Sequence, residues 1–546
     1  MKHINKSLLV FFLLSFFLSG CTDFLIEENP SEVTTEFLYN TEDGLQAAVT
    51  GLYNLERAMV DDNESSDFAV VAGDCGTDID FMRAALNQCV ARYRPDLSFP
   101  TQGVVSNWWK KEYRLIERTN NIITYGEVTS MLPADKKKIL REAYIHRANS
   151  YFWLVRKFDN IWLNLEPTTV NNVENRSFTV ASKEDVYKVI IADLDTAISY
   201  FDNDWTVSSG RYGLGAALFL RIDVALWRQD YQTAATLAEK LIKEGPYSLV
   251  DPASIFTKDS RDNTKESIYV MQFDEFAVGG ADVSTTSGGP SGHRLALVFT
   301  ADYKAVTPGT KQVSEFGGYG WARVFPNEYL LSLYNPKYDK RWNAWWQHYY
   351  TFNDETCNFT SLPYKFGDTL KYNSKVATLS GTNFFKNVSV GCKKYFDWVK
   401  IPNTTRSFNN FYIYRFAEVY LMAAEAYMRL GDNTKALFYI NALRHSRILS
   451  TDPNQTLATM DEETLIEEHA RELAFEGRRW FFLKRLGLLV ERVRATGGTT
   501  MFRGIVATDP AWYSARTNIQ DFHTSWPIPQ SEIDAMGGFP QNPGYN

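Results

Sequence analysis

Aromatic rings are concentrated in residues 316–350, where 12 of 35 positions carry Phe, Tyr or Trp, about twice the density of the whole chain. A flat ring can cover the apolar C–H face of a sugar, provided that Asp, Asn, Gln or Arg side chains at its edge bond the hydroxyl groups. Trp321, Trp345 and Trp346 are the candidate platforms for this contact. The alternative interpretation is that these rings pack in a core, as most large aromatic side chains do.

A second candidate stretch, residues 61–105, has no helical periodicity and is dense in side chains that can hold hydroxyl groups. The candidates are Asp74, Asp78, Asp80, Arg83, Asn87, Tyr93 and Arg94. Long loops on a helical scaffold often carry the function, although a solvated polar loop explains the same residues. The alternating acids could also hold Ca²⁺, but the further oxygen ligands and the closing Glu of an EF-hand are missing, so we predict no metal.

The sequence contains no motif for a known catalytic site. It has no P-loop, no G-x-S-x-G elbow, no G-x-G-x-x-G and no H-E-x-x-H. We therefore predict a binding protein without catalytic residues or cofactor. A secreted glycosidase is the less favoured interpretation, because it needs only two carboxylates about 5–10 Å apart and 65 acids give no basis for choosing or excluding such a pair.

Residues 471–485 carry a run of Arg and Lys that resembles a phosphate or nucleic-acid patch. Acidic residues are interleaved with them, which favours a structural network of ion pairs. The whole chain has 57 Lys and Arg against 65 Asp and Glu, a net charge of −8, so its bulk charge excludes a strongly basic nucleic-acid binder. His469, next to this segment, is expected to be a packed or exposed side chain on a helix rather than a ligand.

The elements that must position these candidates are mainly helices. Thr41 is placed to cap a helix whose apolar residues recur at helical spacing. Further amphipathic helices are expected from near Trp108 and from Arg141, and Ser182 begins a capping box ahead of another. Periodicity of this kind indicates a mainly α fold.

Residues 415–447 form the clearest unit, in which two amphipathic helices flank Gly431 and a short turn that makes them pack antiparallel. Shifting this unit back by 202 positions aligns Asp432 with Asp230, so the same helix pair occurs twice. Small residues in both pairs allow close packing of the tetratricopeptide type, but a fixed period of about 34 residues is absent. We expect an irregular α-helical scaffold with tetratricopeptide-like helix pairs.

The helical pattern fades between about 251 and 410, where Gly, Ser, Thr and Asn become frequent. This composition predicts loops with a few short strands, among them an extended run over Ser267–Met271. The aromatic-rich stretch falls inside this region.

The first twenty residues have the layout of a secretory signal peptide, with basic residues followed by an apolar run too short to span a bilayer. The run ends in Leu18-Ser19-Gly20-Cys21, which resembles the lipobox of bacterial lipoproteins. Cys21 would then be the lipid-bearing first residue of the exported chain. Stable attachment requires more than one acyl chain, which a multiply acylated Cys21 would supply.

Four further cysteines follow Cys21. An exported protein crosses an oxidising compartment, so Cys75 with Cys89 and Cys357 with Cys392 could form disulfides, although the sequence does not fix the connectivity. Buried free thiols are the alternative. The spacing fits no zinc pattern.

Five separated segments resemble the SusD/RagB family of outer-membrane nutrient-binding lipoproteins. They are residues 21–25, 41–53, 415–426, 471–480 and 526–545. These segments extend over nearly the whole exported chain. Two positions depart from the family pattern, because His469-Ala470 stands where Glu-Arg is frequent and Phe482 stands where Asp is frequent. Both departures bear on local ion pairs rather than on the assignment.

The resemblance implies a helical scaffold on the cell surface that binds glycan oligosaccharides and passes them to a SusC-like TonB-dependent outer-membrane transporter. A peptide-binding uptake lipoprotein of the same family is the alternative. The implied divisions are a signal peptide over 1–20, a helical region over 21–250, a variable ligand-binding region over 251–410, and a helical region over 411–546 that packs with the first as one scaffold. No ligand-binding residue carries over by motif, because the family's sites are built from variable loops.

Overall fold

The structure is a computed structural model of the 546-residue chain. It describes residues 35–61, 75–82, 88–94, 99–101, 103–169, 171–206, 208–257, 264–274, 292–303, 309–372, 388–398, 407–497, 501–502, 505–506 and 514–545. The expected signal peptide, the lipobox and Cys21 lie outside these residues. Within the described ranges, none of the helices combines the length and the apolar composition needed to cross a bilayer.

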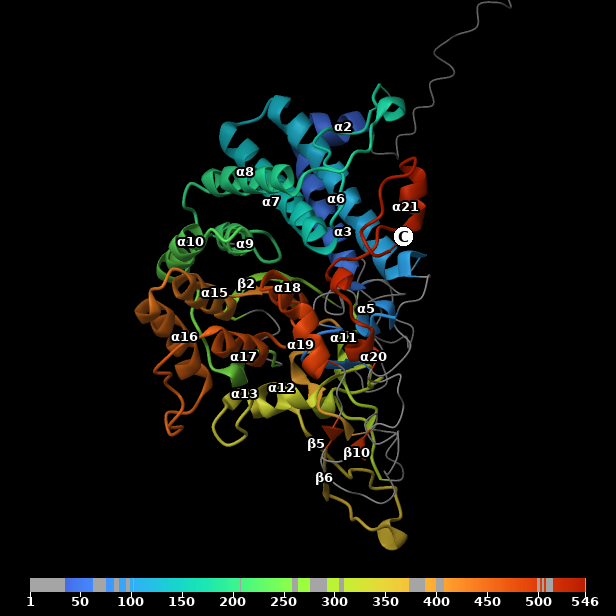
Figure 1. The fold of residues 1–546 in the computed structure, drawn as a ribbon, viewed down its shortest axis with the longest axis vertical. Coiled ribbons are helices and arrows are strands. Elements are labelled where there is room, and N and C mark those ends of the chain that lie inside the picture. Colours follow the sequence, from blue (N-terminus) through green and yellow to red (C-terminus); the bar gives the residue numbers. More distant parts are fainter. Residues whose placement is uncertain are drawn as a thin grey trace, which may run out of the picture.

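Helices from the first part of the chain form the upper part of the molecule in Figure 1. They are α2 (Thr35–Asn40), α3 (Glu42–Asp61), α6 (Gly103–Val128), α7 (Pro133–Lys157) and α8 (Lys183–Tyr200), whereas the short α5 (Gln88–Arg92) lies lower in the view. Both predicted caps are present, since the Thr41 hydroxyl accepts from the Gly44 N–H and the Ser182 hydroxyl accepts from the Asp185 N–H, each at 3.1 Å. α6, α7 and α8 pack against one another in succession.

Two helix pairs continue this packing. They are α9 (Leu214–Trp227) with α10 (Tyr231–Glu244), and α15 (Phe416–Arg429) with α16 (Asn433–Arg447). Asp230 and Asp432 cap the second helix of each pair, and the residues just before them, Gln229 and Gly431, both have left-handed backbone with φ of 58° and 80°. The predicted repeat is therefore present. α10 packs against α15, so the two pairs lie side by side although they are far apart in sequence (Figure 1).

The core runs through these helices. α9 is largely apolar, and every residue from Leu214 to Leu226 is buried, including the ion-paired Arg221 and Asp223. A helix of this composition must be covered on all faces, and α8, α10, α15 and the strand β2 pack around it. The mainly α fold is thus confirmed, whereas the tetratricopeptide-like character of the pairs remains a prediction.

Short elements connected by loops make up the described part of 251–410. The helices are α11 (Leu295–Phe299), α12 (Glu328–Ser332) and α13 (Lys340–Trp345). All of the strand pairs that the structure describes are antiparallel. They are β1 (Asp80–Met82) with β3 (Val324–Pro326), β2 (Ser267–Met271) with β8 (Phe411–Arg415), β4 (Trp346–Gln347) with β7 (Gly391–Cys392), β5 (Tyr349–Thr351) with β6 (Thr369–Lys371), and β9 (Met501–Phe502) with β10 (Ile505–Val506). The predicted extended run is β2, which is bonded to the strand that leads directly into α15.

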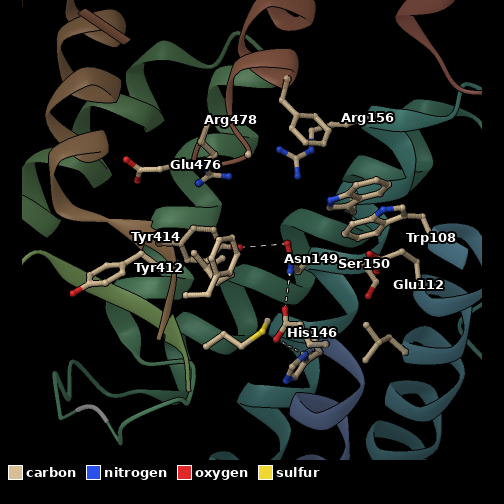
Figure 2. A pocket seen from close by; sticks show the side chains of 18 residues that line it. Trp108, Glu112, His146, Asn149, Ser150, Arg156, Tyr412, Tyr414, Glu476 and Arg478 are labelled. Carbon is tan, nitrogen blue, oxygen red and sulfur yellow. Dashed lines mark hydrogen bonds and ion pairs between the residues drawn. The ribbon is translucent and has the colours of Figure 1, made fainter. Parts of the chain in front are cut away.

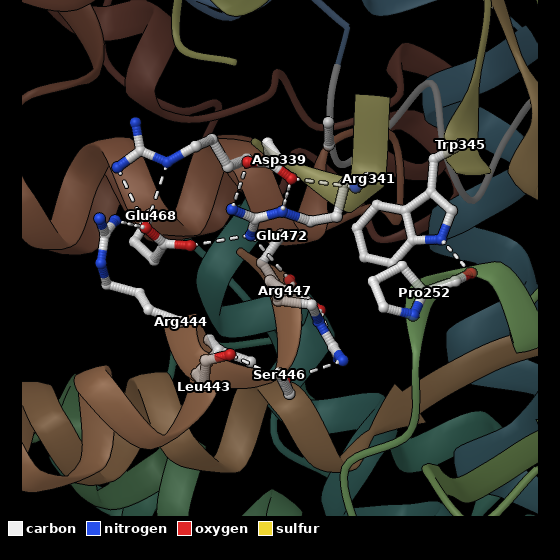
Figure 3. Close-up of polar contacts among 12 residues, drawn as sticks. Pro252, Asp339, Arg341, Trp345, Leu443, Arg444, Ser446, Arg447, Glu468 and Glu472 are labelled. Atoms are coloured by element: carbon white, nitrogen blue, oxygen red, sulfur yellow. Dashed lines mark hydrogen bonds and ion pairs between the residues drawn. The ribbon is translucent and has the colours of Figure 1, made fainter. Parts of the chain in front are cut away.

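The C-terminal part adds α17 (Glu462–Leu473), α18 (Arg479–Arg485), α19 (Leu489–Thr496), α20 (Ser514–Asn518) and α21 (Gln530–Ala535). The predicted ion-pair network is present here, but it is buried rather than exposed (Figure 3). Glu472 contacts the guanidinium groups of Arg341, Arg415 and Arg447 at 2.9, 2.8 and 3.0 Å. Burial would raise the pKa of Glu472, yet these three cations hold it well below its usual range. The network joins α17 to α13, β8 and α16.

Candidate functional site

The pairing of β1 with β3 brings the two predicted candidate stretches together. Met82 lies opposite Val324, and Asp80 lies opposite Pro326. Residues 75–82 therefore run beside the segment that begins at Trp321. This neighbourhood could not be read from the sequence, because the two strands are more than 240 positions apart.

Trp321 is half-buried and is held by backbone contacts to α11. The backbone N–H of Trp321 donates to the Leu297 carbonyl oxygen at 2.8 Å. Gly320, just before it, lies so near α11 that a Cβ at this position would come within 2.2 Å of the Ala301 carbonyl oxygen. Only glycine fits this approach, so the backbone that carries the Trp321 ring is closely supported.

Two guanidinium groups flank the Trp321 ring. The central carbon of Arg294 lies 5.6 Å from the ring centroid, and that of Arg323 lies 5.5 Å from it. A guanidinium group carries five N–H donors in a planar arrangement, which suits hydroxyl or carboxylate oxygens at the edge of a ring. Trp321, Arg294 and Arg323 thus combine an apolar ring with hydrogen-bond donors, and we take them as the candidate ligand surface.

Trp345 and Trp346 do not belong to this surface, so their prediction as sugar platforms is wrong for this structure. Both side chains are fully buried. The Trp345 indole N–H donates to the Pro252 carbonyl oxygen at 3.1 Å (Figure 3), and the Lys394 ammonium lies 4.5 Å from its ring centroid. Trp346 packs edge-on against Phe475. The alternative, that these rings belong to the core, holds for both of them.

Two candidates of the polar stretch are also structural. Asp78 is fully buried, and the Arg479 guanidinium donates to its carboxylate. Tyr93 is buried, and its hydroxyl donates to the Gly76 carbonyl oxygen. Their burial keeps both side chains out of contact with a solvent-borne ligand, so neither is a ligand-binding residue in this structure. The candidates Asp74, Arg83 and Asn87 lie outside the described residues.

Asp80 bears on the Ca²⁺ interpretation of the same stretch. Its carboxylate accepts from the Thr77 and Gly76 N–H groups at 2.7 and 3.2 Å, and burial raises its pKa to about 7. A carboxylate whose oxygens already accept hydrogen bonds from backbone N–H groups is poorly suited to bind a cation. Among the residues that the structure describes, no group of three His, Cys, Asp or Glu side chains is arranged to hold a metal ion.

The structure decides one of the two possible disulfides, the one between Cys357 and Cys392. Cys357 is a free thiol, so the expected bridge to Cys392 is not formed. Cys75 is buried in the core around β1. The side chain of Cys89, its expected partner, lies outside what the structure describes.

A pocket that the sequence did not indicate lies between α3, α6, α7 and the strands β2 and β8 (Figure 2). The cavity has a volume of about 100 Å³, which is smaller than most small-molecule sites, and its open mouth adds further space. Its lining residues are Glu56, Trp108, Glu112, Leu115, His146, Asn149, Ser150, Trp153, Arg156, Met271, Phe411, Tyr412, Ile413, Tyr414, Glu476, Gly477, Arg478 and Phe481. They come from six separate segments, the sixth being residues 476–481 at the start of α18. The one available signal was the presence of Glu112 and His146 at buried positions of otherwise apolar helix faces.

Burial controls the charge of the titratable groups in this pocket. It lowers the pKa of His146 to about 3, so the imidazole is neutral near pH 7. It raises the pKa of Glu112 well above the usual carboxyl range, and it also raises the pKa of Glu56, which accepts hydrogen bonds from the Tyr212 and Tyr269 hydroxyls. His146 is therefore neutral and burial disfavours the charged forms of both carboxyl groups, whereas Arg156, Arg478 and Glu476 contribute charges to the lining.

Known structures share this fold. A SusD homologue from Bacteroides thetaiotaomicron superimposes with a TM-score of 0.73 at 22% sequence identity, over 94% of this chain and 99% of that one. A laminarin-binding SusD-like protein gives 0.67 at 20% identity, over 93% and 100%. Surface glycan-binding protein A from Bacteroides uniformis gives 0.66 at 18% identity, over 93% and 100%. At these identities the likeness concerns the fold alone.

Sequence comparison gives the same class. Residues 297–545 match the SusD family, and residues 23–217 match a SusD-like family described as starch-binding and associating with the outer membrane. SusD-like protein P2 of Formosa agariphila is 25% identical over 508 residues, which cover 89% of this chain and 91% of that protein. The starch-binding protein SusD of Bacteroides thetaiotaomicron is 31% identical over 133 residues, covering 24% and 21%. The two matches extend over residues 23–217 and 297–545, and the chain belongs to the SusD-like family.

Proposed function

We propose that this protein is a lipoprotein of the outer cell surface that binds glycan oligosaccharides and delivers them to a SusC-like TonB-dependent transporter. Lipid on Cys21 anchors it in the outer membrane. Family membership supports this function, as do the starch-binding, laminarin-binding and surface glycan-binding names of its relatives. No bond of the glycan is broken, because the role is capture and transfer.

The observation that carries the proposal is the supported, half-buried Trp321 ring with Arg294 and Arg323 at 5.5–5.6 Å. A pyranose needs an apolar face and hydrogen-bond donors within reach of its hydroxyl oxygens. This cluster offers both, beside the β1–β3 pair and next to the variable loops. The buried rings of the same aromatic-rich stretch serve to hold the loop-rich region together.

Isothermal titration of the purified protein against a panel of oligosaccharides and peptides tests the ligand class. We expect saturable binding of at least one oligosaccharide and none of the peptides. Reducing-end analysis of the same mixtures checks for hydrolysis, and we expect the glycans to remain intact. Binding of peptides only would favour the peptide-uptake alternative, and cleavage would favour a glycosidase.

The anchor and the partner need a separate experiment in the native host. We expect a fatty-acid label to be incorporated into the protein and lost in a Cys21→Ala variant, which would also leave the membrane fraction. Pull-down after mild detergent extraction should recover a TonB-dependent barrel. A protein that is unlabelled and unanchored in its host would contradict the proposed localisation.

A further inference from the structure

The pocket between α3, α6, α7 and β8 is separate from the Trp321 surface, and its lining indicates a ligand of its own. Two polar atoms in its wall are buried and have no hydrogen-bond partner among the described residues, Nε2 of His146 and Nη2 of Arg478. His146 is only 1% exposed. An unsatisfied buried polar group costs about 1–3 kcal/mol, so this space favours an occupant rich in oxygen atoms over a hydrocarbon.

The charges around the pocket are already matched. Arg156 pairs with Asp223 at 3.3 Å, and Arg478 pairs with Glu418 at 2.9 Å. The Glu476 carboxylate is taken up by Lys394 and Arg415. Because each fixed charge has its partner, a charged ligand would gain no unpaired counter-ion here and would lose its hydration.

Hydroxyl groups suit the polar atoms of the lining that have no hydrogen-bond partner. A hydroxyl can both donate and accept, so it can satisfy the donor on Arg478 and the imidazole of His146 in either tautomer, and it can also bond the Ser150 hydroxyl. Asn149 is already bonded to Glu56 and Tyr212. Figure 2 shows these groups arranged around one common space, with Arg478 and His146 at opposite ends. The arrangement presents polar partners in several directions rather than in one line.

Aromatic rings supply the apolar part of the lining. The Trp108 ring is stacked on Trp153 with centroids 3.9 Å apart and planes within 3°, which fixes its orientation. Tyr414 lies on the facing side, where its hydroxyl contacts Asn149, whereas the Tyr412 ring points away from the space (Figure 2). The cavity volume of about 100 Å³ excludes an extended chain, so at most one sugar ring can enter, with part of it in the open mouth.

We propose that this pocket binds a single neutral sugar residue, with its hydroxyl groups on Arg478, His146 and Ser150 and its C–H face against the ring of Trp108. The site would hold a monosaccharide or the end of a captured chain inside the scaffold. The choice of a sugar rests on the proposed function, whereas the location and the neutral charge rest on the pocket itself.

Titration of the purified protein with D-glucose, D-galactose, D-mannose and D-xylose, followed by ligand-observed NMR and calorimetry, tests the proposal. D-Galacturonate and D-glucosamine provide charged comparisons. We expect at least one neutral sugar to bind with one-to-one stoichiometry, and both charged sugars to bind at least tenfold more weakly. Absence of neutral monosaccharide binding, or tighter binding of a charged one, would overturn the proposal.

Two variants locate the binding. His146→Phe keeps a ring against its neighbours but removes Nε2, and Ser150→Ala removes the hydroxyl without adding volume. We expect each variant that folds, as judged by thermal unfolding, to bind the sugar at least tenfold more weakly, while Phe438→Ala on the exposed face of α16 serves as the unchanged control. Unaltered affinity in both pocket variants would place the sugar elsewhere and overturn the assignment.

A crystal structure with the sugar makes the test independent of the variants. Density for a sugar ring beside Trp108 would support the proposal, and ordered water alone at saturating sugar would refute it. Oligosaccharide binding measured on the same preparation separates the two claims. Its loss would contradict the proposed function, whereas loss of monosaccharide binding alone would contradict only the pocket assignment.

Discussion

The Asp78 carboxylate accepts two hydrogen bonds from the Arg479 guanidinium, from Nε at 2.8 Å and from Nη2 at 2.7 Å, although the residues are 401 positions apart. Both side chains are fully buried. The pair ties the segment that precedes β1 to the start of α18. A polar residue that suits sugar binding by type therefore acts as a structural link between the loop-rich region and the helical scaffold.

Removing the carboxylate of this pair should destabilise the fold strongly. Asp78→Ala leaves the Arg479 guanidinium buried without its anion, which costs about 3–5 kcal/mol in the free energy of unfolding. Urea denaturation measures the loss. Lys137→Ala, which breaks the exposed pair with Asp202, is the control and should cost at most about 1 kcal/mol. Similar losses in the two variants would contradict the structural role of Asp78.

The turn of the two helix pairs gives a second prediction. Gly431→Ala should lower the free energy of unfolding by about 1 kcal/mol, since a Cβ would meet no atom within 4 Å and only the left-handed backbone penalises it. Gln229→Gly, at the corresponding position of the other pair, should raise it by up to about 1 kcal/mol. Gly103→Ala, where φ is not positive, is the control and should not destabilise. Thermal unfolding of the three variants checks the correspondence.

The C-terminal segment should depend on a single buried amide. Asn542 is fully buried, accepts from the Asn160 N–H at 2.8 Å and donates to the Trp526 carbonyl oxygen at 2.6 Å. Asn542→Ala leaves two backbone groups without partners, so we expect a loss of about 2–4 kcal/mol in chemical denaturation. Gln530→Ala, which removes an exposed hydrogen bond, should change stability by less than about 0.5 kcal/mol. Equal effects would show that the C-terminal stretch does not need this contact.

Acid sensitivity follows from His146. Its pKa is lowered by burial from 6.5 to about 3, so between these values the unfolded chain binds a proton that the folded chain does not. Stability is therefore lost as pH falls through this window, by about 2 kcal/mol between pH 7 and pH 5. His146→Phe should lack this part of the pH dependence. Parallel urea titrations at both pH values would contradict the account if wild type and variant lost the same stability.

The helices were predictable because their signals are local. Apolar spacing and the capping residues Thr41 and Ser182 act within a few positions of the element that they define. The repeat of Asp230 and Asp432 was visible for the same reason, since each caps its own helix. The ion-pair network near Glu472 was recognisable from interleaved charges, but its burial was not.

The candidate site was predicted only in part, because burial depends on contacts between distant segments. Trp321 and Trp345 are the same residue type in the same aromatic-rich stretch, yet one is half-buried against α11 and the other lies under Pro252. No pattern in the sequence separates them. The pocket of Figure 2 was missed because α3, α6, α7 and β8 form it jointly.

The most direct test of the central claim is the affinity of a Trp321→Ala variant for the oligosaccharide that the wild-type protein binds. The loss of one platform exposes apolar area of the sugar and of the site, at about 25 cal/mol per Å². We expect an affinity at least tenfold weaker by isothermal titration, with Phe438→Ala unchanged and with both variants folded. Wild-type affinity in Trp321→Ala would contradict the assignment of the glycan to this surface.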